Sequence, residues 1–348
     1  MKRAFLVLVG LALVAAAGFG FLLYKRTSEP FKGYRTTEQF VTIEPGSSTR
    51  TIGQRLVEAG VVRNDVTFRA ALWLSGHARS LQAGEFRFDQ PMTPTDVIEK
   101  IARGDVFSRR ITFPEGLTIR EMARIFEAEG FGKAPAFVEA ARDVSGIRGI
   151  DPAATDLEGY LFPETYSLPR NTTAAKLVWM MLTRFRELFN QEMQQAASAH
   201  ELTPRQAVTL ASLVEKETAL ASERPMVAAV YLNRLKIGMG MQADPTVIYA
   251  LQRAGRYDGN LRRDDLQFDS PYNTYKYSGL PPGPIASPGL ASLQAAVAPA
   301  PVDFLYFVSR NDGSHVFART LAEHNENVRQ FQVLYFREQR AAQGAKKP

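Results

Sequence analysis

The chain has 348 residues, of which 45% are hydrophobic and 22% charged, a balance typical of a globular protein of two or three domains and not of a disordered one. Its formal charge is +6, but the basic residues alternate with acidic ones and form no run interleaved with aromatics, so we expect no nucleic-acid partner. The sequence has no cysteine, which excludes disulfides and thiol catalysis, and its four histidines lack the spacing of metal ligands, so we expect neither a metal nor another cofactor.

The amino terminus is an uncharged apolar run, from residue 4 to residue 24, with a Lys/Arg pair on each side. About 20 apolar residues in a helix span the hydrocarbon core of a bilayer. A cleaved signal peptide is the alternative, because the letters AAAG resemble a cleavage site, but the apolar run continues beyond them and favours a retained anchor. Since a short head stays inside more readily than a long body, we expect a single-pass protein whose body is outside. Residues 1–26 are then the cytoplasmic tip and transmembrane anchor, and 27–38 a linker.

The next segment contains one pattern twice, since residues 41–72 can be laid over residues 111–141. Each copy reads as a short strand, a glycine turn, a helix, a glycine stop and a second helix. The matched glycines are Gly46 with Gly116 and Gly60 with Gly130. An alternating strand at 81–88 completes a βααβ unit after the first copy. We therefore expect a small α+β subdomain over 39–106 and a second small α+β unit over 107–155, which either bind glycan or serve only as scaffolding.

The remainder of the chain is predicted to be mostly helical from about residue 173, so the expected fold class is α+β with a helical domain over 156–340. Helix starts are indicated by proline in the first turn. They are expected at Thr203-Pro204, with Gln206 completing a capping box, at Pro225 and at Asp244-Pro245.

A loop and a closing hairpin with its last helix complete this domain. Residues 269–289 are too rich in proline and glycine for a helix or a central strand. Residues 302–309 and 315–318 read as a closing hairpin, which a last helix follows. Residues 341–348 are expected to be a disordered tail.

The stretch ASLVEKETALASER, residues 211–224, concentrates candidate acids on one predicted helix. A projection at 100° per residue places Glu217 beside the leucine and valine side chains of the two preceding turns, Glu215 on a flank that turns polar, and Lys216 towards solvent. Apolar burial raises the pKa of a carboxyl, as a proton donor near neutral pH requires, so the projection slightly favours Glu217. The alternative is that both glutamates edge a solvated face and pair with Lys216 or Arg224.

Three more glutamates are candidates for a role in the site. Glu223 either supplies negative charge to the start of the Pro225 helix or orients and stabilises the reacting groups. Glu158 and Glu164, in the stretch LEGYLFPETY, either bind sugar or hold their loop.

Candidate sugar ligands lie in the later loops. Tyr272, Asn273, Tyr275 and Tyr277 offer ring faces and an amide that suit a pyranose, unless they only hold a long loop together. Gln242, Asp244, Asn233 and Arg234 flank the neighbouring helices. Asp244 is expected to be an N-cap, and Asn233 and Arg234 to line the site or to cap and pair.

Five stretches resemble, in order and spacing, the endolytic murein transglycosylase (YceG-like) family, and together they cover essentially the whole chain. They are LEGYLFPETY, ASLVEKETALASER, YLNRLKIGMGMQADPTVIYAL, YNTYKYSGLPPGPIASPG and LAEHN. The resemblance implies a single-pass anchor in the cell inner membrane, a LysM-like subdomain, and a catalytic domain of lytic-transglycosylase fold in the periplasm. It also implies cleavage of nascent peptidoglycan strands between N-acetylmuramic acid and N-acetylglucosamine, which leaves a 1,6-anhydro end and terminates strand growth.

The resemblance also distinguishes the two central glutamates. In related lytic transglycosylases the catalytic Glu precedes Ser or Thr, which implies Glu217, followed by Thr218, and not Glu215. One acid suffices because the sugar's own 6-hydroxyl attacks the anomeric carbon, whereas a glycoside hydrolase normally needs two carboxyls. The implied partners are peptidoglycan strands, the inner membrane through residues 4–24, and peptidoglycan synthases. The alternatives are a glycan hydrolase using two of Glu215, Glu217 and Glu223, and a non-catalytic cell-wall binding protein.

Overall fold

The computed structural model describes residues 2–337, without the side chains of 2–9, 12, 16, 19, 22 and 23. The expected tail at 341–348 lies outside the described residues. The chain divides into two compact units, the first made of residues 1–110 with 167–170 and the second of 111–166 with everything from 171 onward.

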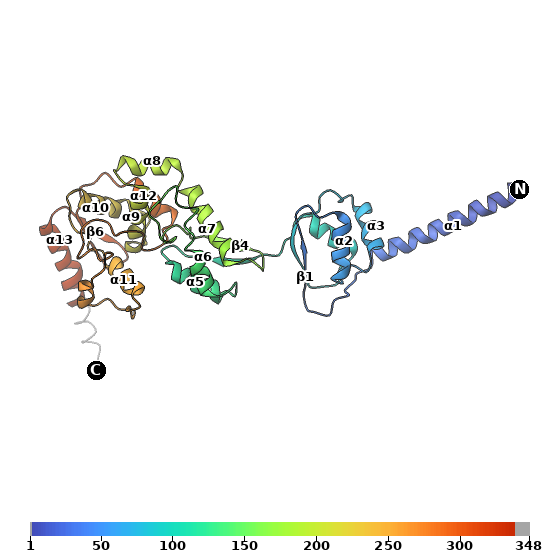
Figure 1. The fold of residues 1–348 in the computed structure, drawn as a ribbon, viewed down its shortest axis with the longest axis horizontal. Coiled ribbons are helices and arrows are strands. Elements are labelled where there is room, and N and C mark those ends of the chain that lie inside the picture. Colours follow the sequence, from blue (N-terminus) through green and yellow to red (C-terminus); the bar gives the residue numbers. More distant parts are fainter. Residues whose placement is uncertain (1, 338–348) are drawn as a thin grey trace, which may run out of the picture. The chain divides into compact units, whose positions relative to one another are not determined.

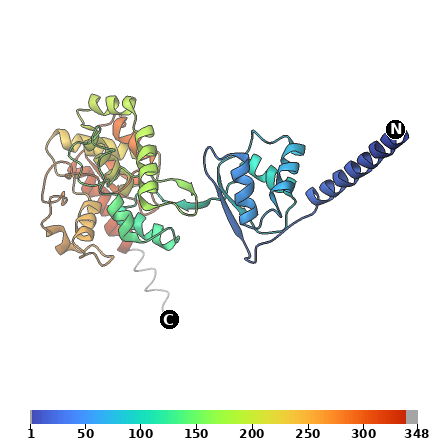
Figure 2. The same ribbon diagram turned by 45° about the vertical axis from the view of Figure 1, so that its right-hand side comes forward.

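The chain begins with the helix α1 (Lys2–Thr27), which contains the predicted apolar run and is drawn as one continuous helix in Figures 1 and 2. Among the residues that the structure describes, no helix meets the length and apolarity that a membrane span requires. The transmembrane anchor therefore stays a prediction.

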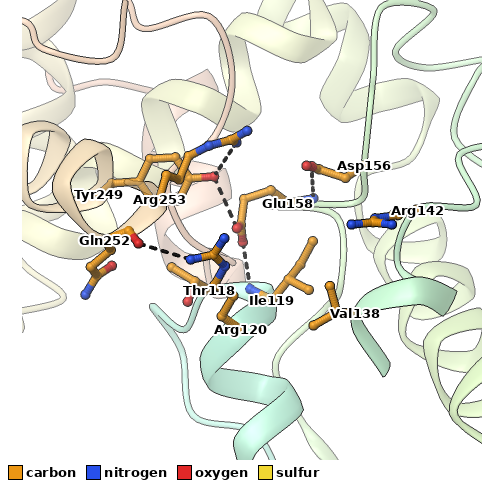
Figure 3. A pocket seen from close by; sticks show the side chains of 10 residues that line it. All are labelled: Thr118, Ile119, Arg120, Val138, Arg142, Asp156, Glu158, Tyr249, Gln252 and Arg253. Carbon is orange, nitrogen blue, oxygen red and sulfur yellow. Dashed lines mark hydrogen bonds between the residues drawn. The ribbon is translucent and has the colours of Figure 1, made fainter. Parts of the chain in front are cut away.

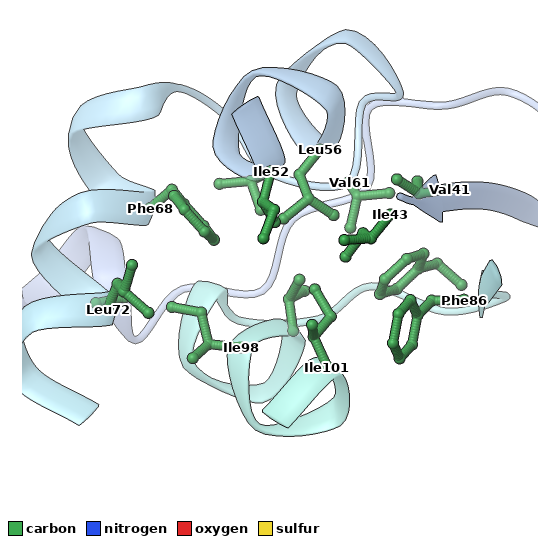
Figure 4. Packing of buried hydrophobic residues seen from close by; sticks show 14 residues of the cluster. Val41, Ile43, Ile52, Leu56, Val61, Phe68, Leu72, Phe86, Ile98 and Ile101 are labelled. Atoms are coloured by element: carbon green, nitrogen blue, oxygen red, sulfur yellow. The ribbon is translucent and has the colours of Figure 1, made fainter. Parts of the chain in front are cut away.

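The first unit continues with the predicted βααβ arrangement, which the structure confirms. Its elements are β1 (Gln39–Ile43), α2 (Thr49–Glu58), α3 (Asp65–Ser75), β2 (Gly84–Phe88) and α4 (Pro94–Ala102). The strands β1 and β2 pair antiparallel, from Gln39 opposite Phe88 to Ile43 opposite Gly84. Figure 4 shows the core between them and the helices, where Leu56 of α2, Phe68 of α3 and Ile101 of α4 are completely buried.

The second copy of the pattern repeats the first in local structure. Its elements are β3 (Arg109–Thr112), α5 (Ile119–Ala128) and α6 (Ala134–Ala140). The glycine turns have nearly the same φ in the two copies, +78° at Gly46 and Gly116, then +68° at Gly60 and +70° at Gly130, values that favour glycine. The strand β3 pairs with β4 (Thr165–Leu168), so the second copy is βααβ as well. The sequence did not predict β4.

The helical part of the second unit is built around one buried helix, α9 (Pro204–Glu217). Its residues 207 to 214 are all buried, and it contacts the helices α8, α10, α11 and α12 (Figure 1). Its amino end has the predicted capping box, in which the Gln206 amide donates to Thr203 Oγ1 (3.2 Å) and the Thr203 amide to Gln206 Oε1 (2.9 Å). Because α9 is buried over most of its length, its carboxyl end at Glu217 is held in a fixed place in the domain.

The remaining elements surround α9. They are α7 (Ala174–Leu188), α8 (Gln191–Ala199), α10 (Arg224–Lys236), α11 (Asp244–Arg253), the 3₁₀ turn η1 (Arg263–Gln267), α12 (Leu290–Val297), β5 (Tyr306–Ser309), β6 (His315–Ala318), α13 (Leu321–Val328) and the π-helical turn η2 (Arg329–Leu334). The closing hairpin is confirmed, with Tyr306 opposite Ala318 and Ser309 opposite His315. The helix starts expected at Pro204, Pro225 and Pro245 are confirmed as well.

Candidate active site

Glu217 is the last residue of α9, and the chain leaves the helix at Thr218 with φ −138° and ψ 133°. Its side chain is partly exposed, and its Oε1 accepts a hydrogen bond from the Tyr231 hydroxyl of α10 at 2.7 Å. The carboxyl-terminal end of a helix carries partial negative charge, which disfavours a carboxylate there. A carboxyl at this place is both reachable from solvent and biased towards its protonated form.

The pKa of Glu217 is raised above its usual value by several opposing effects. Desolvation by burial is the largest and raises it, and the negative charge of Asp244 raises it further. The hydrogen bond from Tyr231 and the positive charges of His315 and Arg234 act in the other direction but do not cancel the burial. Burial and the same carboxyl raise the pKa of Tyr231 well above 10, so its hydroxyl stays protonated and donates to Glu217.

Glu223 sits at the N-cap position of α10 but makes no capping bond. Its carboxylate accepts from the backbone amide of His315 (2.8 Å) and the hydroxyl of Thr218 (3.2 Å), and bonds His315 Nδ1 (2.7 Å). Burial acts to raise the pKa of Glu223, but the two hydrogen bonds with His315 outweigh it and the pKa is lowered. The ionised carboxylate thus fixes the turn that follows Glu217 and the orientation of His315.

Glu215 has different surroundings from those its helix projection indicated. Its side chain is only 6% exposed, because Arg224 Nη2 lies 3.1 Å from one carboxylate oxygen and the Gly289 amide donates to the other at 2.9 Å. The expected pairing with Arg224 is therefore found for Glu215 and not for Glu217. Lys216 is exposed, as predicted, and donates to the Gly116 carbonyl at 3.1 Å.

Asp244 begins α11, but the expectation that it caps this helix is wrong. The N-cap residue is Ala243, and no side-chain capping bond is present. The Asp244 carboxylate instead accepts from the hydroxyl of Tyr275 at 2.6 Å, because the loop returns past the helix start. Gln242 is exposed and has φ +50°, an uncommon conformation for a residue other than glycine.

Asn233 and Arg234, at the end of α10, separate into two roles. The Asn233 amide donates to the carbonyls of Val302 (2.9 Å) and Phe304 (3.0 Å), which ties α10 to the segment before β5. Arg234 Nη1 donates to the Met241 carbonyl at 2.6 Å, and its charge acts on Glu217. Arg234 therefore belongs to the surroundings of the acid, and Asn233 to the support of the hairpin.

The predicted sugar-binding loop is divided between two places. Tyr275 and Tyr277 are exposed, and Tyr275 lies at the Glu217 site through Asp244. Asn273 is completely buried, and its amide donates to the carbonyls of Leu266 (3.0 Å) and Phe268 (2.8 Å). The ring of Tyr272 packs on that of Tyr249 with centroids 4.9 Å apart.

Glu158 and Glu164 have hydrogen-bond partners outside the Glu217 cluster. The buried Glu158 carboxyl accepts from the Ile119 amide (3.0 Å) and the Tyr249 hydroxyl (3.2 Å), and lines a separate cavity. Glu164 forms a partly exposed ion pair with Arg184 at 3.1 Å.

Sequence reasoning missed two members of the site, Tyr231 and His315. A tyrosine within an apolar stretch of a helix is a signal that its hydroxyl needs a partner, but nothing in the local sequence indicates that the partner is Glu217. His315 was treated as isolated because Glu223 is 92 positions away in the chain. Among the described residues, no group of His, Asp and Glu could hold a metal ion.

A partly exposed carboxyl with a raised pKa, close to the Tyr231 hydroxyl, the Asp244 carboxylate and the exposed Tyr275, is the arrangement of an enzyme that works by general acid–base catalysis. The α+β fold places this carboxyl at the end of its central helix. The chain belongs to the YceG-like family, whose model matches residues 41–330.

Relatives of known name agree with this family. A protein of Bacillus subtilis (strain 168) named endolytic murein transglycosylase is 33% identical over 329 residues, which are 89% of each chain. A Streptococcus pneumoniae protein of the same name is 30% identical over 94% of this chain, which spans 65% of that longer protein. A crystal structure of a YceG-like protein from Listeria monocytogenes matches with a TM-score of 0.57 and 29% identity, over 83% of this chain and 98% of that one.

Proposed function

We propose that this protein is an endolytic murein transglycosylase, which cuts peptidoglycan strands between N-acetylmuramic acid and N-acetylglucosamine and thereby terminates their growth. The observation that carries the proposal is the Glu217 carboxyl, partly exposed at the end of α9 and with a raised pKa. The named relatives, which are similar over most of the chain, support the substrate class.

Glu217 performs both proton transfers of the proposed reaction. Its carboxyl gives its proton to the glycosidic oxygen, and the bond from that oxygen to the anomeric carbon of the muramic acid breaks. The 6-hydroxyl oxygen of the same sugar forms a bond to the anomeric carbon, and its proton passes to the Glu217 carboxylate. The acid is restored, no water is consumed, and the products are a 1,6-anhydro end and a free 4-hydroxyl.

The surrounding groups support this single-acid reaction. Two of the carboxylates considered for a hydrolase have other partners, Glu215 in its ion pair with Arg224 and Glu223 in its bonds to His315 and Thr218. A hydrolase needs a second carboxyl to activate water or to attack the sugar. Asp244, whose charge acts on Glu217, likewise has a partner, the Tyr275 hydroxyl at 2.6 Å.

The products distinguish these reactions. Purified glycan strands are incubated with wild type, Glu217→Gln and Glu215→Gln, and the new ends are identified by mass spectrometry. We expect anhydro ends from wild type and from the folded Glu215→Gln protein, and a loss of roughly 10²–10⁴-fold in rate for Glu217→Gln. New ends that have gained water would show that the enzyme is a hydrolase. Full activity of Glu217→Gln would assign the acid role to another residue, and absence of cleavage by wild type would leave a binding protein.

We further propose that residues 4–24 anchor the chain in the inner membrane with its second unit in the periplasm, beside the peptidoglycan synthases. This rests on the uncharged run and its charged flanks. The first unit, by its βααβ order, is proposed to be LysM-like and to hold glycan, which is an argument from fold alone. Carbonate extraction of membranes tests the anchor, because a peripheral protein is released and an inserted one stays.

A further inference from the structure

A polar cavity with a volume of about 230 Å³ lies in the second unit, between α5, α6, the loop before β4, and α11. Figure 3 shows the Glu158 carboxyl at its centre, between the Ile119 amide and the Tyr249 hydroxyl, with arginines around it. The proposed reaction at Glu217 uses none of these groups. A cavity of this size is smaller than the ~300–1,000 Å³ of sites for whole drug-sized ligands and suits a small group.

The charge of the cavity favours an anion. Burial raises the pKa of Glu158 to about 8, so this carboxyl is neutral at pH 7. Arg120, Arg142 and Arg253 line the cavity with exposed side chains, against one partly buried carboxylate, Asp156. Arg142 is paired with Glu139 at 2.8 Å.

The other two arginines keep their charge available. Arg120 donates to the carbonyl of Gln252 (3.1 Å) and Arg253 to the hydroxyl of Tyr249 (3.2 Å), both neutral acceptors. Within the described part of the chain, neither has a carboxylate oxygen within 4.0 Å. A guanidinium with free N–H groups can bind a carboxylate through two parallel hydrogen bonds, in bidentate geometry.

The cavity is linked to the proposed active site through α11. This helix has ten residues and is therefore about 15 Å long, with Asp244 at its Glu217 end and Arg253 at its cavity end. A second cavity, of about 280 Å³, shares Thr118, Tyr249 and Gln252 with the first and reaches Lys216 and Pro245, which adjoin Glu217 and Asp244 in sequence. The lining of the two cavities therefore runs from the arginines to the sequence neighbours of Glu217 and Asp244.

We propose that this cavity binds a carboxylate of the peptide that a muramic acid of the substrate strand carries. In a peptide-bearing strand the lactyl carboxyl of the muramic acid is joined to the peptide as an amide, so the free carboxylates are those of the peptides. The inference rests on the proposed function, since it assigns a second subsite for the same strand. It makes the enzyme sensitive to the state of the peptides and not only to the glycan.

The test uses three forms of one strand preparation: with its peptides, with the peptide carboxyls converted to amides, and with the peptides removed. Binding is measured by calorimetry on the full-length Glu217→Gln protein, so that no strand is cut. We expect the peptide-bearing strand to bind on the order of tenfold more tightly than the amidated one, as a charge-assisted hydrogen bond predicts. Adding Arg120→Gln should abolish most of this preference.

A matched control lies on the same helix. Arg124 is an exposed residue of α5, one turn from Arg120, that does not line the cavity, so Arg124→Gln should keep the full preference. Equal binding of the peptide-bearing and amidated strands, or a preference that survives Arg120→Gln, would overturn the subsite. Wild-type cleavage of peptide-free strands, measured in parallel, reports on the proposed function separately. Failure to bind any of the three strands overturns both.

Discussion

At the scale of single residues, the Glu217 carboxyl is balanced between neighbours that favour its protonated form and neighbours that favour its ionised form. Burial and the charge of Asp244 act for the first, and Tyr231, His315 and Arg234 for the second. A residue that first gives a proton and then takes one back needs both influences, because a pKa near the working pH serves both steps. The balance can be shifted in either direction by a single substitution.

Removing the Tyr231 hydroxyl raises the pKa of Glu217. In Tyr231→Phe the Glu217 carboxylate loses its hydrogen bond (2.7 Å in wild type), so its pKa rises and the alkaline limb of the kcat pH profile, where the acid loses its proton, moves to higher pH. We expect kcat at the optimum to fall about tenfold with the loss of a bond to a charged group. Tyr277→Phe, whose hydroxyl bonds Asp269, is the control and should leave the profile in place.

Removing the Asp244 carboxylate lowers the pKa of Glu217. In Asp244→Asn the negative charge that raises the pKa of Glu217 is lost, while the amide oxygen can still accept from Tyr275. The alkaline limb should therefore move to lower pH, opposite in sign to Tyr231→Phe. A pH–rate series on the purified variant measures this, and a limb that stays where it is in wild type would mean that Asp244 does not act on the acid.

At the scale of elements, the end of α9 is fixed by neighbours that are distant in sequence. Glu215 is clamped by Arg224 at the start of α10 and by Gly289 at the start of α12. Helical periodicity predicted which residues of α9 face inward, because the spacing of apolar residues is a local property. The same periodicity placed Glu215 on a polar flank, because a helix projection contains no information about Arg224, which belongs to the next helix and contacts Glu215 only in the folded chain.

The clamp gives a prediction about stability that is separate from catalysis. Glu215→Ala leaves the Arg224 side chain, which is 10% exposed, without its closest partner and should lower the free energy of unfolding by about 3 kcal/mol. The measurement is denaturant unfolding followed by a pH–rate profile on the folded protein. A profile that moves as far as that of Tyr231→Phe would show Glu215 to be part of the acid's electrostatics and not only of its support.

At the scale of the whole molecule, the first compact unit is made of two separate pieces of chain, and the repeat predicted only one of them. The first unit includes residues 167–170 as well as 1–110, so the chain passes between the units at both β3 and β4. The two copies of the pattern were found by their matched glycines and helical spacing, which are local signals. The pairing of β3 with β4 was not found from the sequence. The paired positions are more than 50 residues apart, and the four residues of β4 are too few to show an alternating pattern.

This division predicts where the chain can be shortened. A protein beginning at residue 107 keeps β3, and with it every residue of the Glu217 site, so it should fold and give the same product ends as the full chain. One beginning at residue 115 loses the buried Ile111 and Phe113 and the backbone partners of β4, and should be clearly less stable. Thermal unfolding and mass spectrometry of the products check both. Equal stability of the two shortened proteins would contradict the pairing's role.

The sequence by itself determined the α+β class, the repeated unit and the helix starts, and it predicted Glu217 rather than Glu215 as the acid. These depend on apolar spacing, proline and glycine positions, and short motifs, all of which are properties of a few consecutive residues. Only the tertiary structure decided what surrounds Glu217: Tyr231 from α10, Asp244 from the start of α11, Tyr275 from a loop, and His315 oriented by Glu223. It also separated Glu158 and Tyr272 from that site. The physical reason is that hydrogen bonds and charges act through space, whereas sequence patterns record only neighbours along the chain.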